Sequence, residues 1–293
     1  MAEDYEALMH VHSCLSRKYL SHLTLDRIVG SAYETGKKIL VITDSNRDDA
    51  TSIILSDPQK ILPGFKVYQF DDRGLVVEKQ NRKLYVLNGM EFHGPQGHII
   101  SAGHRIVNKN GLPYNDDYDV KDTVDSIHEY GGLAIPAHIL HEAVYGLSEE
   151  QLLELIYRTN LDDRIDAVET FNALNIRLIP WLVDARKYNV RAKKFAEEHN
   201  IPGIAAPDAH ALSHMDSAYV IFYDLDFTSG EKLVESMRGC LQKRTHDNIT
   251  YDNVENYVTW REFIDWAVIN KFKSIEEIYS IFKVAGRVIK ERL

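Results

Sequence analysis

Residues 5–12 read Tyr-Glu-Ala-Leu-Met-His-Val-His, and this stretch decides how the rest of the chain is interpreted. The apolar run has the length of a buried strand, and it ends in two histidines separated by one residue. Because successive side chains of a strand point to opposite faces, His10 and His12 share one face while Val11 points to the other. The pattern predicts a strand over residues 5–11 with a pair of imidazoles at its carboxyl end.

Short apolar runs of this kind alternate with helical patterns along most of the chain. Such alternation is typical of an α/β protein with a mainly parallel sheet and crossover helices. The expected strands span residues 5–11, 39–43, 84–91, 133–137, 167–170, 201–205 and 218–222. The expected helices run from the Thr24 cap to Gly36, over residues 120–130, from the Ser148 capping box onward, and over residues 186–199, 230–238, 260–269 and 275–292. Residues 64–87 predict a small antiparallel hairpin inserted before the strand that ends at Glu91.

Composition excludes several classes of protein. The chain has 293 residues, a formal net charge of -10 and only two cysteines, Cys14 and Cys240, so neither a disulfide framework nor a zinc ribbon is expected. We expect a cytoplasmic protein with no membrane partner, because no secretory pattern and no bilayer-spanning apolar run is present. Duplex nucleic acid is not expected as a partner, because its binding depends on Lys and Arg neutralising phosphates. A small phosphorylated partner stays compatible, because carboxylates that hold cations are counted as negative here.

Side chains that can bind metal follow the expected strands one after another. They are His10 and His12, then Asp44, Glu91, His138 and Glu169, and finally Asp208 and His210. Because the carboxyl ends of parallel strands open at one mouth, these residues are expected to converge there. Each one alone has an ordinary explanation, such as a packed histidine or a capping aspartate. Their joint position at strand ends indicates a site of imidazoles and carboxylates, which suits Zn, Mn or Fe.

Together these residues form an ordered set of motifs. The set comprises Met9-His10-Val11-His12-Ser13, Ile42-Thr43-Asp44-Ser45-Asn46, Gly89-Met90-Glu91, Gly97-His98-Ile99-Ile100, Ala137-His138 and Pro207-Asp208-Ala209-His210. From about residue 5 to 210 it resembles the polymerase and histidinol phosphatase (PHP) domain, and residues 234–239 resemble the segment that often follows this domain. The resemblance implies a distorted (β/α)7 TIM-like barrel that hydrolyses phosphoesters with two or three divalent metals. Residues 1–250 would form this domain, including an associated segment over about 211–250, and residues 251–293 a small C-terminal helical extension.

The resemblance also implies roles for individual residues. His10, His12, Glu91 and Asp208 would hold one metal, and Glu91 would bridge to a second metal held by His98 and His138. His98 is preferred to His104 because of its Gly-His-Ile-Ile context, although either could reach the site. Asp44 and His210 complete the expected ligand set, with His210 in the third metal position or against the substrate.

Two positions depart from the family pattern. Ser45 stands where family members usually have histidine, and Arg17 stands where an acidic residue or histidine is expected. The third metal position is therefore expected to be incomplete, with Arg17 or Arg47 supplying a fixed positive charge that clamps phosphate. Asp208 or His210 would move the proton.

The expected function is metal-dependent phosphoester hydrolysis of a small phosphorylated metabolite or a nucleotide. One alternative is an amidohydrolase, since that superfamily also opens its barrel with His-x-His. Another is a degenerate PHP barrel that binds a phosphorylated ligand without catalysis. The C-terminal helices would cover the barrel or form a contact between copies in a homo-oligomer, and the sequence leaves both open.

Overall fold

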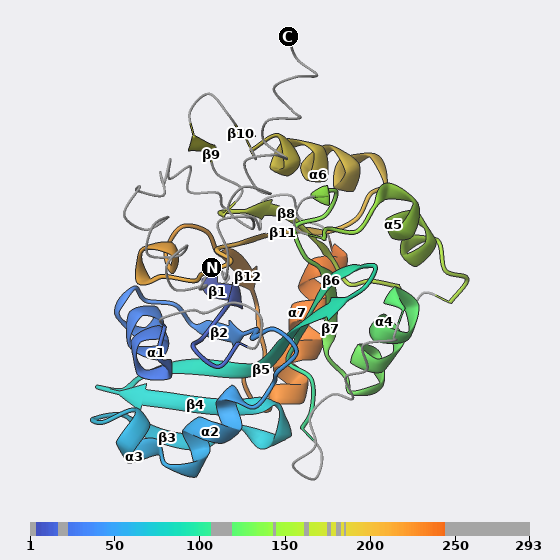
Figure 1. The fold of residues 1–293 in the computed structure, drawn as a ribbon. Helices are drawn as coiled ribbons and strands as arrows, with labels where there is room; N and C mark the ends of the chain where they lie inside the picture. The colour runs from blue at the N-terminus through green and yellow to red at the C-terminus, as the bar shows by residue number, and fades with distance from the viewer. Residues whose placement is uncertain are drawn as a thin grey trace.

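The computed structural model describes residues 4–16, 23–106, 119–142, 145–160, 164–174, 177–179, 183–184 and 186–243. Its elements in chain order are β1 (Asp4–Val11), α1 (Leu25–Glu34), β2 (Ile39–Ile42), α2 (Ala50–Ser56), α3 (Pro58–Ile61), β3 (Lys66–Gln69), β4 (Gly74–Lys79), β5 (Arg82–Gly94), β6 (Gly97–Ala102), α4 (Val120–Glu129), β7 (Leu133–Pro136), α5 (Glu149–Ile156), β8 (Val168–Asn172), β9 (Arg177–Ile179), β10 (Val183–Asp184), α6 (Arg186–Glu198), β11 (Gly203–Ala206), β12 (Val220–Tyr223) and α7 (Gly230–Lys243) (Figure 1). Arg17 and the helices expected over residues 260–269 and 275–292 lie outside the described residues. The division at residue 250 stays a prediction.

The strands form one large mixed sheet and two smaller pairs. The large sheet runs β12-β1-β2-β5-β4-β3, with β6 paired to β5 and β7 paired to β6. Strands β1, β2 and β5 are parallel, whereas β12, β4, β6 and β7 join by antiparallel pairing. The parallel pair β8–β11 forms a separate sheet. The α/β class is confirmed, and a mixed sheet replaces the mainly parallel one that was expected.

A closed (β/α)7 barrel is not formed by the strands that the structure describes. The hairpin between β5 and β6 accounts for much of the difference, because it turns the chain back at residues 94–97 without a crossover helix. Alternation of apolar residues reveals a strand but not its direction, so the sequence could not distinguish this hairpin from a parallel connection.

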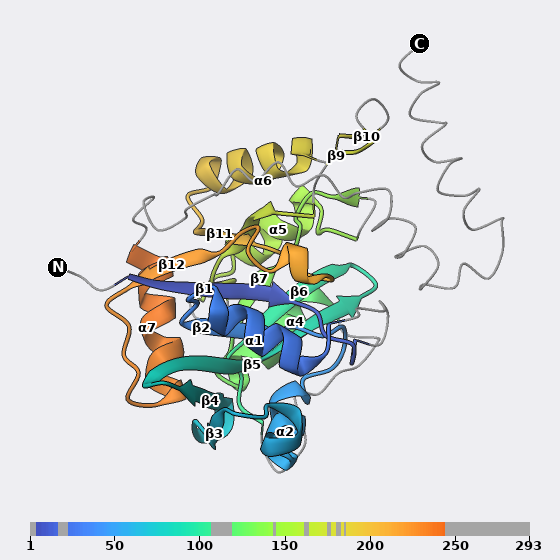
Figure 2. The ribbon, with the colours of Figure 1, turned by 90° about the vertical axis from the view of Figure 1, so that its left-hand side faces the viewer.

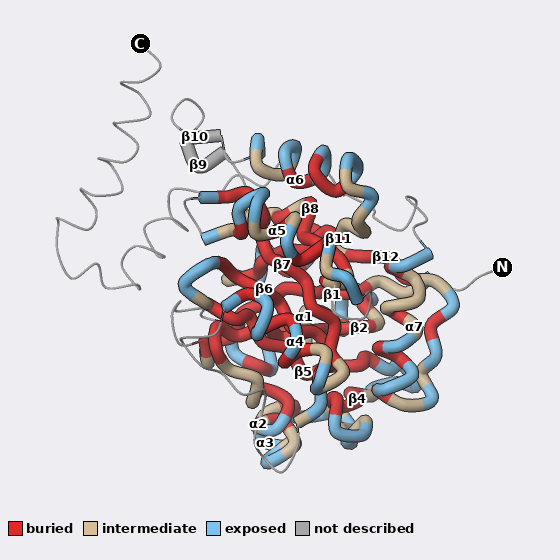
Figure 3. Tube along the Cα trace, turned by 90° about the vertical axis from the view of Figure 1, so that its right-hand side faces the viewer, coloured by how far each residue is buried: buried red, intermediate tan, exposed pale blue. Residues whose placement is uncertain are grey.

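The core lies on both faces of β1 and β2, as the period of two requires. Ala7 and Met9 pack toward α7, where they meet Leu233 and Met237. Leu8 points the other way and joins Ile28 of α1, and Val11 lies in the same cluster because the β1–β2 register shifts between Leu8 and Val11. Figure 2 shows β1 running beside β12, with α7 and α1 on different sides of the sheet. A third cluster lies beneath α4, α5 and α6, and in Figure 3 the outer turns of α6 remain exposed while the strands beneath are buried.

Several helix boundaries follow from their predicted caps. Ser148 Oγ accepts from the Gln151 backbone N–H, and the Gln151 side chain accepts from the Ser148 N–H, so the predicted capping box opens α5. Helix α1 begins after Thr24 and is followed by Gly36 at φ 84°, a left-handed conformation that suits glycine. The Thr24 side chain makes no capping hydrogen bond. None of the helices in the described part of the chain has the length and apolar character needed to cross a membrane.

Candidate metal centre

The paired histidines meet Asp208 because backbone hydrogen bonds join the end of β1 to the turn after β11. The His12 N–H donates to the Ala209 carbonyl at 2.9 Å, and the Ala209 N–H donates to the His10 carbonyl at 3.2 Å. Asp208 has φ 46°, a left-handed conformation that is uncommon for a residue other than glycine. The strained backbone places the Asp208 carboxylate beside both imidazoles, although almost two hundred positions separate them in the chain.

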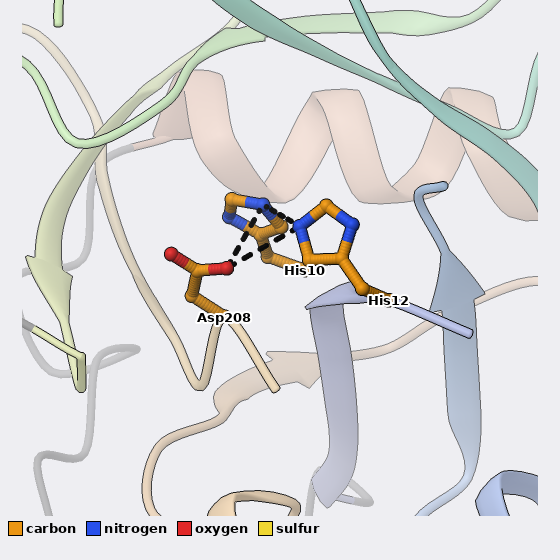
Figure 4. Close-up of side chains that lie close together, drawn as sticks. All are labelled: His10, His12 and Asp208. Atoms are coloured by element: carbon orange, nitrogen blue, oxygen red, sulfur yellow. Dashed lines mark hydrogen bonds and ion pairs between the residues drawn. The ribbon is translucent and has the colours of Figure 1, made fainter. Parts of the chain in front are cut away.

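The first group of metal-competent atoms comprises His10, His12 and Asp208 (Figure 4). The two Nε2 atoms lie 3.0 Å apart, and Asp208 Oδ1 lies 3.5 Å from His10 Nε2 and 3.3 Å from His12 Nε2. Ligands about 2.1 Å from a common ion are separated from one another by roughly 3–3.5 Å. Oδ1 of Asp208 is also buried and makes no hydrogen bond. The donor set and its spacing therefore fit a divalent cation.

The second group comprises Glu91, His93 and His98, presented by the β5–β6 hairpin. His93 and His98 are opposite each other in the register, and their rings stack with centroids 3.7 Å apart. Glu91 Oε1 lies 3.2 Å from His98 Nδ1, and Oε2 is in contact with His93 Nε2. His138 adds its Nε2 3.2 Å from Glu91 Oε1.

Glu91 lies between the two groups. Its Oε1 is 3.5 Å from His10 Nε2, and its Oε2 is 3.5 Å from His12 Nε2. The same carboxylate therefore faces the ring nitrogens of both groups. Such an arrangement allows one side chain to bridge two cations.

The buried charges are mutually stabilised. Burial favours the neutral form of the Glu91 carboxyl, but His93, His98 and His10 outweigh it and hold its pKa well below the usual range. The pKa of Asp208 is lowered in the same way, because His10, His12 and His210 outweigh burial.

Histidines in this site differ in protonation. Burial lowers the pKa of His12 to about 4, assisted by the nearby His210. Burial likewise lowers the pKa of His98 to about 4. Burial also opposes charge on His10, yet Asp208 and Glu169 raise its pKa well above the ordinary value. His12 and His98 are therefore neutral near pH 7, the form that ligates metal, whereas the carboxylates around His10 favour its charged form.

The predicted site residues fall into two sets. The two metal-competent groups bring together His10, His12, Glu91, His98, His138 and Asp208. His210 lies at the rim, where its Nδ1 donates to the Asp208 carbonyl at 2.9 Å and its ring lies 4.4 Å from that of His12. Of the two alternatives, His98 lies in the second group, whereas His104 contacts Ser101 and Asp48.

Asp44 and Arg47 have other partners. The Asp44 carboxylate accepts from the Ser13 backbone N–H and hydroxyl at 2.5 Å each and joins neither group. Burial raises its pKa to about 6, and the hydrogen bonds from Ser13 only partly oppose this. Arg47 pairs with Asp49 through two guanidinium nitrogens. Ser45 hydrogen-bonds with Ser16, so hydroxyls occupy the place where the family resemblance implies an imidazole.

His93 was not predicted from the sequence. Glu91-Phe92-His93 has the same period of two that singled out His10 and His12, but the strand was predicted to end at Glu91, and β5 continues to Gly94. That spacing alone could have identified it. Glu169 was noted but left without a role; its Oε1 lies 3.0 Å from His10 Nδ1 and its Oε2 accepts from the His138 backbone N–H.

The fold and this cluster define an α/β protein with a candidate site of histidine and carboxylate ligands. Residues 186–239 match the family model described as PHP-associated. This match agrees with the PHP resemblance predicted from the motifs, and a protein that contains a predicted PHP-like phosphoesterase shares the fold. No curated protein matches the sequence.

Three solved structures have a similar fold. PsfC from Pseudomonas syringae PB-5123 has a TM-score of 0.54 at 15% identity, covering 79% of this chain and 88% of PsfC. A two-domain protein from Bacteroides vulgatus ATCC 8482, containing a predicted PHP-like metal-dependent phosphoesterase, has a TM-score of 0.51 at 14% identity, covering 83% of this chain and 64% of that one. Endonuclease Q, in complex with a 27-mer duplex that has an abasic lesion at its active site, has a TM-score of 0.50 at 14% identity, covering 82% of this chain and 57% of endonuclease Q. At these identities the likeness concerns the fold.

The expectation that duplex nucleic acid is not a partner is contradicted by the endonuclease Q complex, since a protein of similar fold binds a duplex. The net charge of -10 misled because it sums the whole chain. Carboxylates that would hold cations enter that sum as negative, while local basic surface is averaged away. The exposed side of α6, for example, carries Arg186, Lys187, Arg191, Lys193 and Lys194.

Proposed function

We propose that this chain is a divalent-metal-dependent phosphoesterase. The observation that carries the proposal is the position of Glu91, whose two carboxylate oxygens face ring nitrogens of both metal-competent groups. Two such neighbouring groups of ligands are well suited to phosphoester hydrolysis, because the cations they would hold could stabilise charge on both the attacking and the leaving oxygen. The PHP-associated match and the PHP-like folds support the same reaction class.

His10, His12 and Asp208 would hold one cation, and Glu91, His93, His98 and His138 the other. Bound divalent cations would supply the positive charge that lowers the pKa of water and neutralises phosphate oxygens. The protein's contribution is to keep His12, His98, Glu91 and Asp208 deprotonated and to hold the ligands in place. Burial keeps His12 and His98 neutral, and neighbouring imidazoles keep Glu91 and Asp208 ionised.

Proton movement is assigned to the rim of the site. His210 is the histidine there with part of its side chain exposed, and its Nδ1 is fixed by the Asp208 carbonyl. With Nδ1 fixed in this way, Nε2 would be the nitrogen that exchanges a proton with substrate or solvent. Arg47 would have to leave Asp49 before it could clamp a phosphate, so it is a poor candidate for that role.

The test is an assay of the metal-free protein with and without added Mn²⁺ on three substrates. These are a phosphomonoester, a duplex DNA with an abasic site, and a cyclic amide as the probe for amidohydrolase chemistry. We expect Mn²⁺-dependent hydrolysis of a phosphoester and none of the amide. Elemental analysis of the loaded protein should find two metals per chain. Amide hydrolysis, or phosphate binding by a protein that takes up no metal, would overturn the proposal.

A further inference from the structure

Asn172, the last residue of β8, touches both carboxylates that surround His10. Its Nδ2 donates to Asp208 Oδ2 at 3.0 Å and to Glu169 Oε2 at 3.0 Å. Its Oδ1 accepts from the Leu174 backbone N–H at 2.9 Å. The side chain is almost completely buried, so the side-chain amide is fully used by the protein.

These contacts determine which oxygen each carboxylate turns toward the metal-competent groups. Because Asn172 engages Oδ2 of Asp208, Oδ1 is the oxygen that faces His10 and His12. On Glu169, Oε2 is engaged by Asn172 and the His138 N–H, so Oε1 is directed at His10 Nδ1. An amide is needed here, because a neutral double donor can join two anions that would otherwise repel each other.

Asn172 is itself held by Asn189, which lies near the start of α6. Asn189 Oδ1 accepts from the Asn172 backbone N–H at 3.1 Å, and Asn189 Nδ2 donates to the Asn172 carbonyl at 3.0 Å. One side chain thus satisfies both backbone groups of Asn172, as a neighbouring strand would. Asn189 also belongs to the region that matches the PHP-associated model, residues 186–239.

We propose that Asn172 is a positioning residue for the first metal group, and that Asn189 carries this function from α6 by fixing the Asn172 backbone. The PHP-associated region would thereby contribute to the geometry of the metal centre in addition to supplying Asp208. This inference rests on the proposed function, in that it concerns cation binding by His10, His12 and Asp208.

The experiment measures Mn²⁺ binding to the metal-free protein by titration calorimetry, with no substrate present. Wild type should show two classes of site, one for each group. Asn172→Asp places a third carboxylate against Glu169 and Asp208, and we expect Mn²⁺ affinity to fall about 10–100-fold at one class only. Asn189→Ala should weaken the same class about 10-fold, and Asn189→Asp, which keeps one of the two bonds, should fall between Asn189→Ala and wild type.

Selectivity for one class separates positioning from general structural support. A merely structural role would change both classes together or neither, and circular dichroism with urea unfolding would report it. Lys194→Ala, on the exposed side of the same helix, is the matched control and should bind Mn²⁺ like wild type. If Asn172→Asp fails to fold, Asn189→Ala and Asn189→Asp test the positioning role, because both variants leave the Asn172 side chain unchanged.

The outcomes distinguish this inference from the proposed function. A wild-type chain that binds no Mn²⁺ contradicts the proposed function itself. A wild-type chain with two classes of site, alongside Asn172 and Asn189 variants that bind equally well at both, overturns the positioning role and leaves the proposed function standing.

Discussion

Glu169 Oε1 lies 3.0 Å from Nδ1 of His10, with both side chains buried. The ionised carboxylate requires a proton on Nδ1, so Nε2 of His10 is the nitrogen presented to His12 and Asp208. Carboxylates that hold the far nitrogen of a ligating histidine fix its tautomer and make it a better ligand. Glu169 therefore holds His10 in the tautomer whose Nε2 could ligate a cation.

Replacing this carboxylate tests that relationship. Glu169→Gln keeps the size of the side chain but removes the charge, and we expect Mn²⁺ affinity to fall about 10–100-fold. Calorimetric titration of the metal-free variant measures it. Glu150→Gln, at an exposed position in the first turn of α5, is the control and should bind like wild type. Unchanged affinity in Glu169→Gln would remove Glu169 from the site.

Removing the charge of Glu91 should have the broader effect, because this residue faces both groups. In Glu91→Gln we expect fewer than two metals per chain by elemental analysis and at least about a 100-fold loss of phosphoesterase turnover. His104→Gln alters a buried histidine that contacts Asp48 and Ser101, outside both groups, and should retain its metal. Full metal content together with normal turnover in Glu91→Gln would contradict the bridging arrangement.

The pH dependence of the unfolding free energy should report on Asp166, a carboxylate outside the metal centre whose side chain is almost completely buried. It accepts from His128, the Ala134 N–H and Arg238 Nε, and so connects α4 and β7 to α7. Burial alone would raise its pKa, but the hydrogen bond from His128 and the charge of Arg238 lower it below the ordinary value of 3.8. A carboxyl with a lowered folded pKa stabilises the fold above its unfolded pKa, and this contribution is lost as pH falls through the folded value.

Asp166→Asn should therefore be destabilised by about 2 kcal/mol at pH 7. Urea unfolding at a series of pH values checks it. The gap between the unfolding free energies of variant and wild type should narrow once pH drops below about 4, because the Asp166 carboxyl then takes up a proton in the unfolded chain while it stays charged in the folded one. A gap that is constant from pH 7 to pH 3 would show that the charge of Asp166 contributes nothing.

Gly89 permits the close approach of β5 to β2. Gly89 lies two positions before Glu91. A Cβ at Gly89 would lie 2.5 Å from the Ile42 carbonyl oxygen and 2.5 Å from Val41 Cγ1. We expect Gly89→Ala to lose about 1–3 kcal/mol of unfolding free energy and to weaken Mn²⁺ binding as β5 shifts.

Gly239 in α7 is the control for Gly89, since nothing lies within 4 Å of the position that its Cβ would occupy. Gly239→Ala should stabilise the protein by up to about 1 kcal/mol. Thermal unfolding of both variants measures this, and equal effects of the same sign would contradict the contact.

The seven strands expected from apolar runs are all present, and the Ser148 capping box begins α5 where it was expected. These features are local, so a single sequence specifies them. Strand direction is not local: β6 returns against β5, and no periodicity encodes that choice. The closed barrel, expected from the family resemblance, is not formed by the strands in the described ranges.

Within the site, residues with metal chemistry were easier to predict than those that hold them. His10, His12, Glu91, His138 and Asp208 could be selected because imidazoles and carboxylates at strand ends are conspicuous. Asn172 carries no such signal, since its function comes only from lying between two carboxylates in space. Arg47 illustrates the opposite case. Its charge suggested a phosphate clamp, yet its guanidinium pairs with the carboxylate of Asp49, two residues away.

The pairing of β1 with β12 has a consequence for synthesis. Among the strands of the described residues, β1 is synthesised first, and its antiparallel neighbour β12, Val220–Tyr223, is synthesised last. One side of β1 therefore remains an open edge until β12 has been made, able to recruit strands from other nascent chains. We expect the yield of native protein in cells to depend on how well chaperones shield this amino-terminal edge, and slower elongation ahead of β12 to increase aggregation.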